Sequence, residues 1–182
     1  MSKDSMGIHS WLSRWESLHN PDLLVFDLDP GPRMLFSRLC EAAMVVKDAL
    51  DALDVESFPK TSGANGLHVL VGFQPEFDFE EVRTWVIVVD RVLSEHRPDL
   101  FTMDYTRSRR TDKVLLDHNQ VGYGQTTDSI YSVRLLPGAP VSAPLLWSEV
   151  GSGEITPGLF TIKTPPERLD ALGDLAAAVN GT

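Results

Sequence analysis

Cysteine is almost absent from this chain, because Cys40 is the only one among 182 residues. An internal disulfide is therefore excluded, and no paired cysteines are present to build a zinc site. Long hydrophobic runs are also missing: no stretch approaches the roughly 20 apolar residues of a membrane span, and the N-terminus has no apolar signal-peptide core. These absences predict a cytoplasmic protein without a membrane partner. Cys40 lies within an apolar helical pattern, which predicts a buried thiol.

Basic residues are scarce, with 16 Lys and Arg against 26 Asp and Glu, for a net charge of -10. Affinity for nucleic acid comes largely from neutralising phosphates, so the composition predicts weak DNA binding by the isolated chain. One short segment is an exception, because it concentrates four basic residues: Arg107, Arg109, Arg110 and Lys113. Two interpretations remain open for it, contact with a primer or template backbone and a solvated loop without a partner.

Two carboxylates, Asp27 and Asp29, directly follow the apolar run 23–26. Successive side chains of a strand point to opposite faces, so both carboxylates are predicted on one face, with Leu28 on the other. Like charges this close repel unless a cation lies between them, and an oxygen-only ligand set favours Mg²⁺ or Mn²⁺. The alternative is a strand ending in a polar turn, with an Asp that caps the next helix.

A second segment, 58–71, reads as a loop of small residues that leads into a strand. Its residues Thr61, Ser62, Gly63 and Gly66 let backbone N–H groups and hydroxyls approach an anion, with Lys60 and His68 as charges at the edges. The pattern is typical of a phosphate-binding loop. An ordinary tight turn between two elements is the alternative.

A third carboxylate, Asp117, ends the short apolar run 114–116. The two-residue period places Asn119 on its face and turns His118 away, so His118 is interpreted as structural. A further strand is predicted at 130–135, and antiparallel pairing of the two strands would bring Arg134 toward Asp117. An arginine there suits a triphosphate, although a surface ion pair is the commoner role.

The pattern as a whole predicts one α+β domain over 1–182, with a mainly antiparallel sheet and helices on one face. Apolar residues at intervals of three or four predict helices at about 32–53 and 79–96. Prolines and glycines predict little regular structure over 137–166. Strands are expected near 23–28, 67–73, 114–118 and 130–135, a short helix at about 166–172, and a frayed tail over 174–182.

Several of these segments together resemble a known family. The motifs that carry the resemblance are Ile8–Arg14, Pro21–Asp22, Val25–Gly31, Phe58–Gly63 with Gly66–His68, Val114–Gln120 and Tyr131–Ser142. Their order and spacing are similar to those of the polymerase domain of bacterial ATP-dependent DNA ligase D and its stand-alone relatives, in the archaeo-eukaryotic primase superfamily. The resemblance covers about residues 8–173.

The resemblance implies an RRM-like catalytic module in which Asp27, Asp29 and Asp117 hold two divalent ions, usually Mn²⁺. Those ions would serve nucleotidyl transfer in end-joining repair or priming, with nucleoside triphosphates and DNA ends as substrates. Carried over by position, Ser62 and His68 fall on the triphosphate loop and Arg134 on a phosphate-contacting arginine. Gln120 falls beside the third aspartate, where it is expected to contact the incoming nucleotide or the primer end.

Two departures from the family pattern accompany the resemblance. Asn65 stands where members usually carry a lysine, so positive charge near the triphosphate must come from Lys60 or Arg134. Ligase D polymerase domains also have an N-terminal lobe upstream of the first catalytic strand, and a separate lobe or ligase is therefore expected as a partner.

Two alternative functions follow from the same residues. One is a non-catalytic nucleotide-binding module. The other is a phosphatase similar to the haloacid dehalogenases, in which Asp27 is the nucleophile and Asp29 the acid and base.

Overall fold

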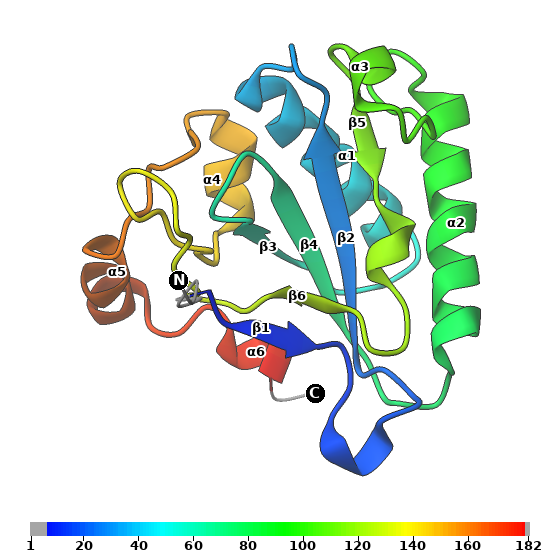
Figure 1. Ribbon diagram of the computed structural model, residues 1–182, viewed down its shortest axis with the longest axis horizontal. Coiled ribbons are helices and arrows are strands. Elements are labelled where there is room, and N and C mark those ends of the chain that lie inside the picture. The colour runs from blue at the N-terminus through cyan, green and yellow to red at the C-terminus, as the bar shows by residue number, and fades with distance from the viewer. Residues whose placement is uncertain (1–6, 181–182) are drawn as a thin grey trace, which may run out of the picture.

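The computed structural model describes residues 7–180, and its centre is a four-stranded antiparallel sheet in the order β3-β4-β2-β5 (Figure 1). A separate two-stranded ribbon pairs β1 with β6, also antiparallel. The strands are β1 (His9–Trp11), β2 (Leu23–Pro30), β3 (Phe58–Thr61), β4 (Leu67–Gly72), β5 (Val114–Leu116) and β6 (Thr126–Asp128). The predicted α+β class with an antiparallel sheet is confirmed. The alternating parallel βα units of a dehalogenase-like phosphatase are not formed, which removes that alternative.

Two long helices, α1 (Phe36–Asp51) and α2 (Phe79–His96), accompany the sheet. The shorter helices are α3 (Arg107–Arg110), α4 (Trp147–Ser152), α5 (Thr164–Leu172) and α6 (Ala177–Asn180), with 3₁₀ turns η1 (Trp15–Ser17) and η2 (His118–Gln120). Helix α2 begins with a capping box: the Asp78 carboxylate accepts from the Glu81 N–H, and the Glu81 carboxylate accepts from the Asp78 N–H. The predicted bounds 79–96 are confirmed, although Val86–Val89 favours strands, because the cap and the apolar face outweigh local propensity.

Strand β2 separates the core from the predicted site. Leu24, Phe26 and Leu28 are at most 2% exposed and belong to the core that α1 and α2 complete, whereas Asp27 and Asp29 alternate with them and remain partly exposed. Cys40 is buried in α1, as predicted. In residues 7–180 we find no helix long and apolar enough to cross a membrane.

The strand predicted at 130–135 does not form. Tyr131 has a positive φ of 65°, which breaks an extended run, and only an isolated bridge joins Val133 to Val141. The strand in this region is β6, which pairs with β1, while β5 pairs with β2. The expected pairing of Arg134 with the Asp117 strand is therefore wrong.

The last described segment packs onto the fold where the sequence predicted a frayed tail. Ala176 and Val179 are buried, and the Tyr131 hydroxyl donates to the Asp174 carboxylate at 2.9 Å. The stretch 137–166, predicted to have little regular structure, contains helix α4 and the start of α5.

Candidate functional site

A row of three charged residues crosses the sheet on the face opposite α1 and α2. The register pairs Asp27 of β2 with His68 of β4, and His68 with Lys60 of β3. His68 Nε2 lies 3.4 Å from Asp27 Oδ1, and His68 and Lys60 are 4% and 1% exposed. Strand pairing alone thus assembles a carboxylate, an imidazole and an amine in one row.

The surroundings of this row set its charges. Burial alone would raise the pKa of Asp27, but the charge and hydrogen bond of His68, together with Lys60 and Arg110, outweigh it and hold that pKa below its ordinary value. Burial lowers the pKa of Lys60 to about 7, although the charge of Asp27 opposes this shift. Burial also lowers the pKa of His68, whose Nδ1 is buried with no hydrogen-bond partner in the described part of the chain. Asp27 is therefore an ionised carboxylate 3.4 Å from His68 Nε2, while the other ring nitrogen of His68, Nδ1, is the one left without a partner.

Lys60 lies deeper than the sequence predicted. Its Nζ donates to the carbonyl of Asp128 at 3.0 Å and to the hydroxyl of Ser142 at 2.8 Å. The expectation that Lys60 stands at the edge of the phosphate loop is corrected, because its amine connects β3 to β6 and to the 142 segment inside the protein.

Arg134 reaches the loop 62–66, which follows β3. Gly63 has a φ of +74°, and a Cβ built there would lie 2.6 Å from Arg134 Cγ, so the side chain lies directly on the loop. Arg134 forms an ion pair with Asp128, whose carboxylate also lies 3.5 Å from His9 Nε2. Ser62 Oγ accepts from the N–H groups of Ala64 and Gly66 and shapes the turn. Ser62 and Arg134 thus lie at the same loop, and the charge of Arg134 also acts on His68, while Arg134 is paired with Asp128 and Ser62 Oγ with N–H groups of the loop itself.

Asp29 and Asp117 flank Asp27 but are engaged by protein groups. Arg110, 4% exposed, donates to Asp29 Oδ2 at 2.8 Å and to its carbonyl at 3.1 Å. The N–H of Asp117 donates to the Asp27 carbonyl at 2.9 Å, while its carboxylate accepts from the Asn119 N–H at the start of η2. Among the described residues, no three His, Cys, Asp or Glu side chains are gathered closely enough for a metal ion. Carboxylate oxygens are the type of ligand that Mg²⁺ and Mn²⁺ take, but in this arrangement an ion at Asp29 would compete with Arg110.

The remaining predicted residues divide between the site and the surface. Gln120 is half-buried at the end of η2, and Asn65 is exposed at the tip of the loop. His118 lies 3.9 Å from the buried Asp90, and its ring packs edge-on against Tyr105, in keeping with a structural role.

In the basic segment, Arg107 and Arg109 are exposed on α3 and Lys113 is half-buried. Arg110 differs from the prediction, because it is buried against Asp29 and does not face a nucleic-acid backbone.

Sequence reasoning missed Asp128 and Ser142. Asp128 contacts His9, Arg134 and Lys60. The sequence feature that could have indicated it is a carboxylate at the end of the short strand Thr126–Asp128. Ser142 carried no local signal, because its partners Lys60 and Thr61 are about 80 residues away.

The fold and this cluster define a module of the primase-polymerase class. The family model "LigD, primase-polymerase domain" matches residues 2–176. The chain belongs to this family.

Two curated relatives and one solved structure show the extent of the similarity. The chain is 32% identical over 168 residues to "Multifunctional non-homologous end joining protein LigD" of Pseudomonas aeruginosa, covering 92% of this chain and 20% of the relative. It is 36% identical over 154 residues to "Bifunctional non-homologous end joining protein LigD" of Bacillus subtilis, covering 84% and 25%. The "Polymerase Domain from Mycobacterium tuberculosis Ligase D in complex with DNA" superposes with a TM-score of 0.83 at 30% identity, covering 88% of this chain and 55% of that one. The chain thus spans a fifth to a quarter of the length of these curated relatives.

Proposed function

We propose that this chain is a metal-dependent nucleotidyltransferase of the polymerase or primase type, acting on DNA ends in end-joining repair. The observation that carries the proposal is the ionised Asp27 beside His68, next to the loop on which Arg134 lies. In this proposal the carboxylate serves cations, and the loop 62–66 with Arg134 on it serves phosphates, as the transfer of a nucleotide from a triphosphate requires.

Each residue has a defined part in the proposal. Asp27, Asp29 and Asp117 would hold two Mn²⁺ or Mg²⁺ ions, which when bound activate a 3′-hydroxyl and stabilise the leaving pyrophosphate. Ser62, His68 and Arg134 bind and orient the triphosphate, and Gln120 contacts the nucleotide or the primer end. Together with His68, the buried Lys60 helps to lower the pKa of Asp27, and we propose this part for Lys60 in place of the direct triphosphate contact expected from the sequence.

The proposed nucleic-acid contacts are few. Arg107, Arg109 and Lys113 would meet the DNA backbone, while the net charge of -10 keeps the isolated chain a weak DNA binder. The relatives are named as multifunctional or bifunctional end-joining proteins, which supports a ligase or a further lobe as the partner that supplies affinity for DNA. We propose a cytoplasmic location, because the DNA of the bacteria in which the named relatives occur lies in the cytoplasm.

A primer-extension assay tests this function. The native chain is given Mn²⁺, nucleoside triphosphates and a recessed DNA duplex, and it is compared with Asp27→Asn and with Asp48→Asn, an exposed carboxylate of α1. Extension should need Mn²⁺ and fall at least about a hundredfold in Asp27→Asn only, since a metal ion contributes several kcal/mol to the transition state. Metal-independent extension, or full activity in Asp27→Asn, contradicts the proposal. Metal-dependent nucleotide binding without extension favours the non-catalytic module instead.

A further inference from the structure

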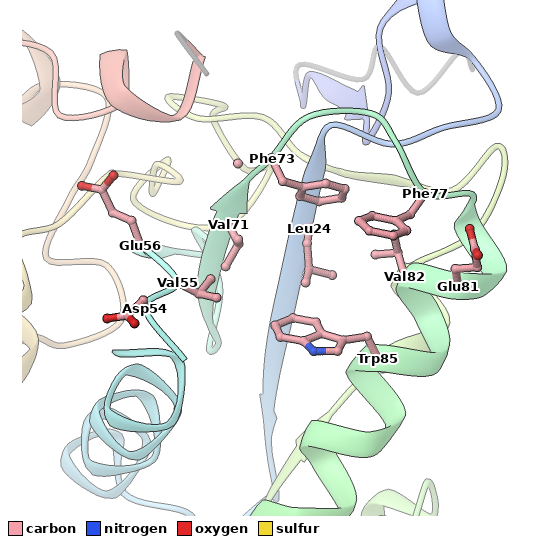
Figure 2. Close-up of a pocket in the computed structure, with 11 residues that line it drawn as sticks. Leu24, Asp54, Val55, Glu56, Val71, Phe73, Phe77, Glu81, Val82 and Trp85 are labelled. Carbon is pink, nitrogen blue, oxygen red and sulfur yellow. The ribbon is translucent and has the colours of Figure 1, made fainter. Parts of the chain in front are cut away.

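An apolar groove of about 670 Å³ lies between α1 and α2. Figure 2 shows Leu24 and Val71 from the sheet on its floor, Val55 on the α1 side, and Phe77, Val82 and Trp85 on the α2 side. We refer to this site, lined also by Asp54, Glu56, Phe73 and Glu81, as the interhelical groove.

The groove opens at one end. Near the N-terminus of α1, Arg97 donates to Glu41 at 2.7 Å and Arg38 pairs with Asp99, so the two helices are tied together there. The groove lies at the other end of the helix pair, beside the C-terminal end of α1 and the first turns of α2. Beyond the groove lining, Val88 and Val92 follow Glu81 and Trp85 along α2 at helical spacing, and each is 51% exposed.

Every charged residue that lines the groove is acidic. Asp54 and Glu56 belong to the connection between α1 and β3, and Glu81 stands on α2, so carboxylates flank the apolar floor on both sides (Figure 2). All three are exposed, and Phe77 at the mouth is 52% exposed. An apolar surface with carboxylates on two sides is complementary to a binding partner that presents a row of apolar side chains with cationic side chains on either side.

We propose that the interhelical groove binds an amphipathic helical segment of a partner protein, with apolar anchors on one side and Lys or Arg on its flanks. Nucleic acid does not fit, because the rim repels phosphates. A second copy of this chain, with its charge of -10, is repelled by the same carboxylates. This inference does not depend on the proposed function.

The groove and the nucleotide site are on opposite faces of the sheet. Leu24 pairs with Val71 across β2 and β4, three positions from the pair Asp27 and His68, and the two-residue period points the two pairs in opposite directions. A partner bound in the groove therefore does not block the proposed nucleotide site. The protein could hold this partner and bind nucleotide at the same time.

Binding of a designed peptide tests the proposal. The probe is a fluorescent helical peptide with Leu at positions i, i+3, i+4 and i+7 and Lys elsewhere, and a second peptide carries Glu in place of Lys. We expect the Leu/Lys peptide to bind, the Leu/Glu peptide not to bind, and the affinity to fall as salt rises. Methyl chemical shifts should change at Val55, Val71 and Val82.

Two variants and two matched controls locate the binding. Phe77→Ser and Glu56→Lys should each weaken binding of the Leu/Lys peptide by about tenfold, the effect of losing an apolar anchor or reversing a rim charge. Leu135→Ser also replaces an exposed apolar side chain by Ser, Glu95→Lys makes the same charge reversal, and both lie outside the groove and should leave binding unchanged.

Several results would overturn the proposal. One is no binding of the Leu/Lys peptide at millimolar concentration, and another is equal affinity for the Leu/Lys and Leu/Glu peptides. The proposal also fails if Phe77→Ser binds the Leu/Lys peptide as tightly as the native chain, or if the methyl chemical shifts change only on another surface. Self-association that Phe77→Ser abolishes would also overturn it, because the occupant would then be a second copy.

Discussion

Asp27 carries the chemistry of the site because its neighbours keep it charged. A carboxylate on a buried sheet would normally take up a proton more readily, and here His68, Lys60 and Arg110 reverse that tendency. The site is thus organised as a row of titratable side chains fixed by strand register, which places an ionised carboxylate near the loop 62–66.

Lys60 is predicted to give the protein a pH-dependent stability. Its pKa is about 7 in the folded chain and 10.5 ordinarily, so between these values the unfolded chain binds the extra proton. The free energy of unfolding should therefore rise with pH over this window, by up to about 1.4 kcal/mol per pH unit, and the burial penalty is present in full below pH 7.

Urea unfolding of the native chain and of Lys60→Met across this window measures the effect. Lys60→Met should be less stable at high pH, because Ser142 and the Asp128 carbonyl lose a donor, but it should lack the rise. An equal rise in both proteins would assign the pH dependence to another group.

Single residues could be predicted from the sequence where a local period governs them. The two-residue period of β2 placed Asp27 and Asp29 together on the face opposite Leu28, and the burial pattern agrees. The partners of Lys60 and Arg110 could not be predicted, because they lie 68 to 82 residues away and are brought close only by packing.

The loop 62–66 is the element whose backbone the site depends on most. Gly63→Ala forces a side chain into the left-handed region and against Arg134, whereas Gly124→Ala adds a side chain at a similar φ of +78° in open space. Both should lose about 1 kcal/mol of stability from backbone strain. Gly63→Ala should lose more, and it should weaken nucleoside triphosphate binding by about tenfold because Arg134 is displaced.

Urea unfolding and calorimetric titration of the two variants test this, with Gly124→Ala as the matched control. Equal stability and equal nucleotide binding in the two variants would show that Arg134 and the loop are not coupled.

Elements were predictable where their ends and faces are encoded locally. The capping box and apolar stripe define α2 completely, whereas 130–135 has the composition of a strand but contains the turn at Tyr131. Strand pairing was the weakest prediction. The sequence suggested that neighbouring segments pair, whereas β6 pairs with β1, more than 100 residues away.

The charge of the whole molecule predicts its behaviour toward DNA. Arg107 and Arg109 are exposed cations on an acidic protein, so replacing both by Ala should weaken DNA binding at low salt. The slope of log affinity against log salt should become shallower by about 2, one for each lost phosphate contact. The measurement is fluorescence anisotropy of a labelled duplex over a salt series.

The control for that measurement is the double variant Arg91→Ala with Lys163→Ala, which removes two exposed cations elsewhere. If this control changes the slope of log affinity against log salt as much as replacing Arg107 and Arg109 does, DNA binding depends on net charge alone and α3 makes no specific contact.

The central claim is that the carboxylates around β2 and β5 form a metal-dependent nucleotide site, and calorimetry of a nucleoside triphosphate with and without Mn²⁺ tests it most directly. The native chain is compared with Asp117→Ala and with Asp112→Ala, an exposed carboxylate just before β5. We predict binding that requires Mn²⁺, is lost in Asp117→Ala and is retained in Asp112→Ala. Binding that is unchanged without Mn²⁺ or in Asp117→Ala would contradict the account.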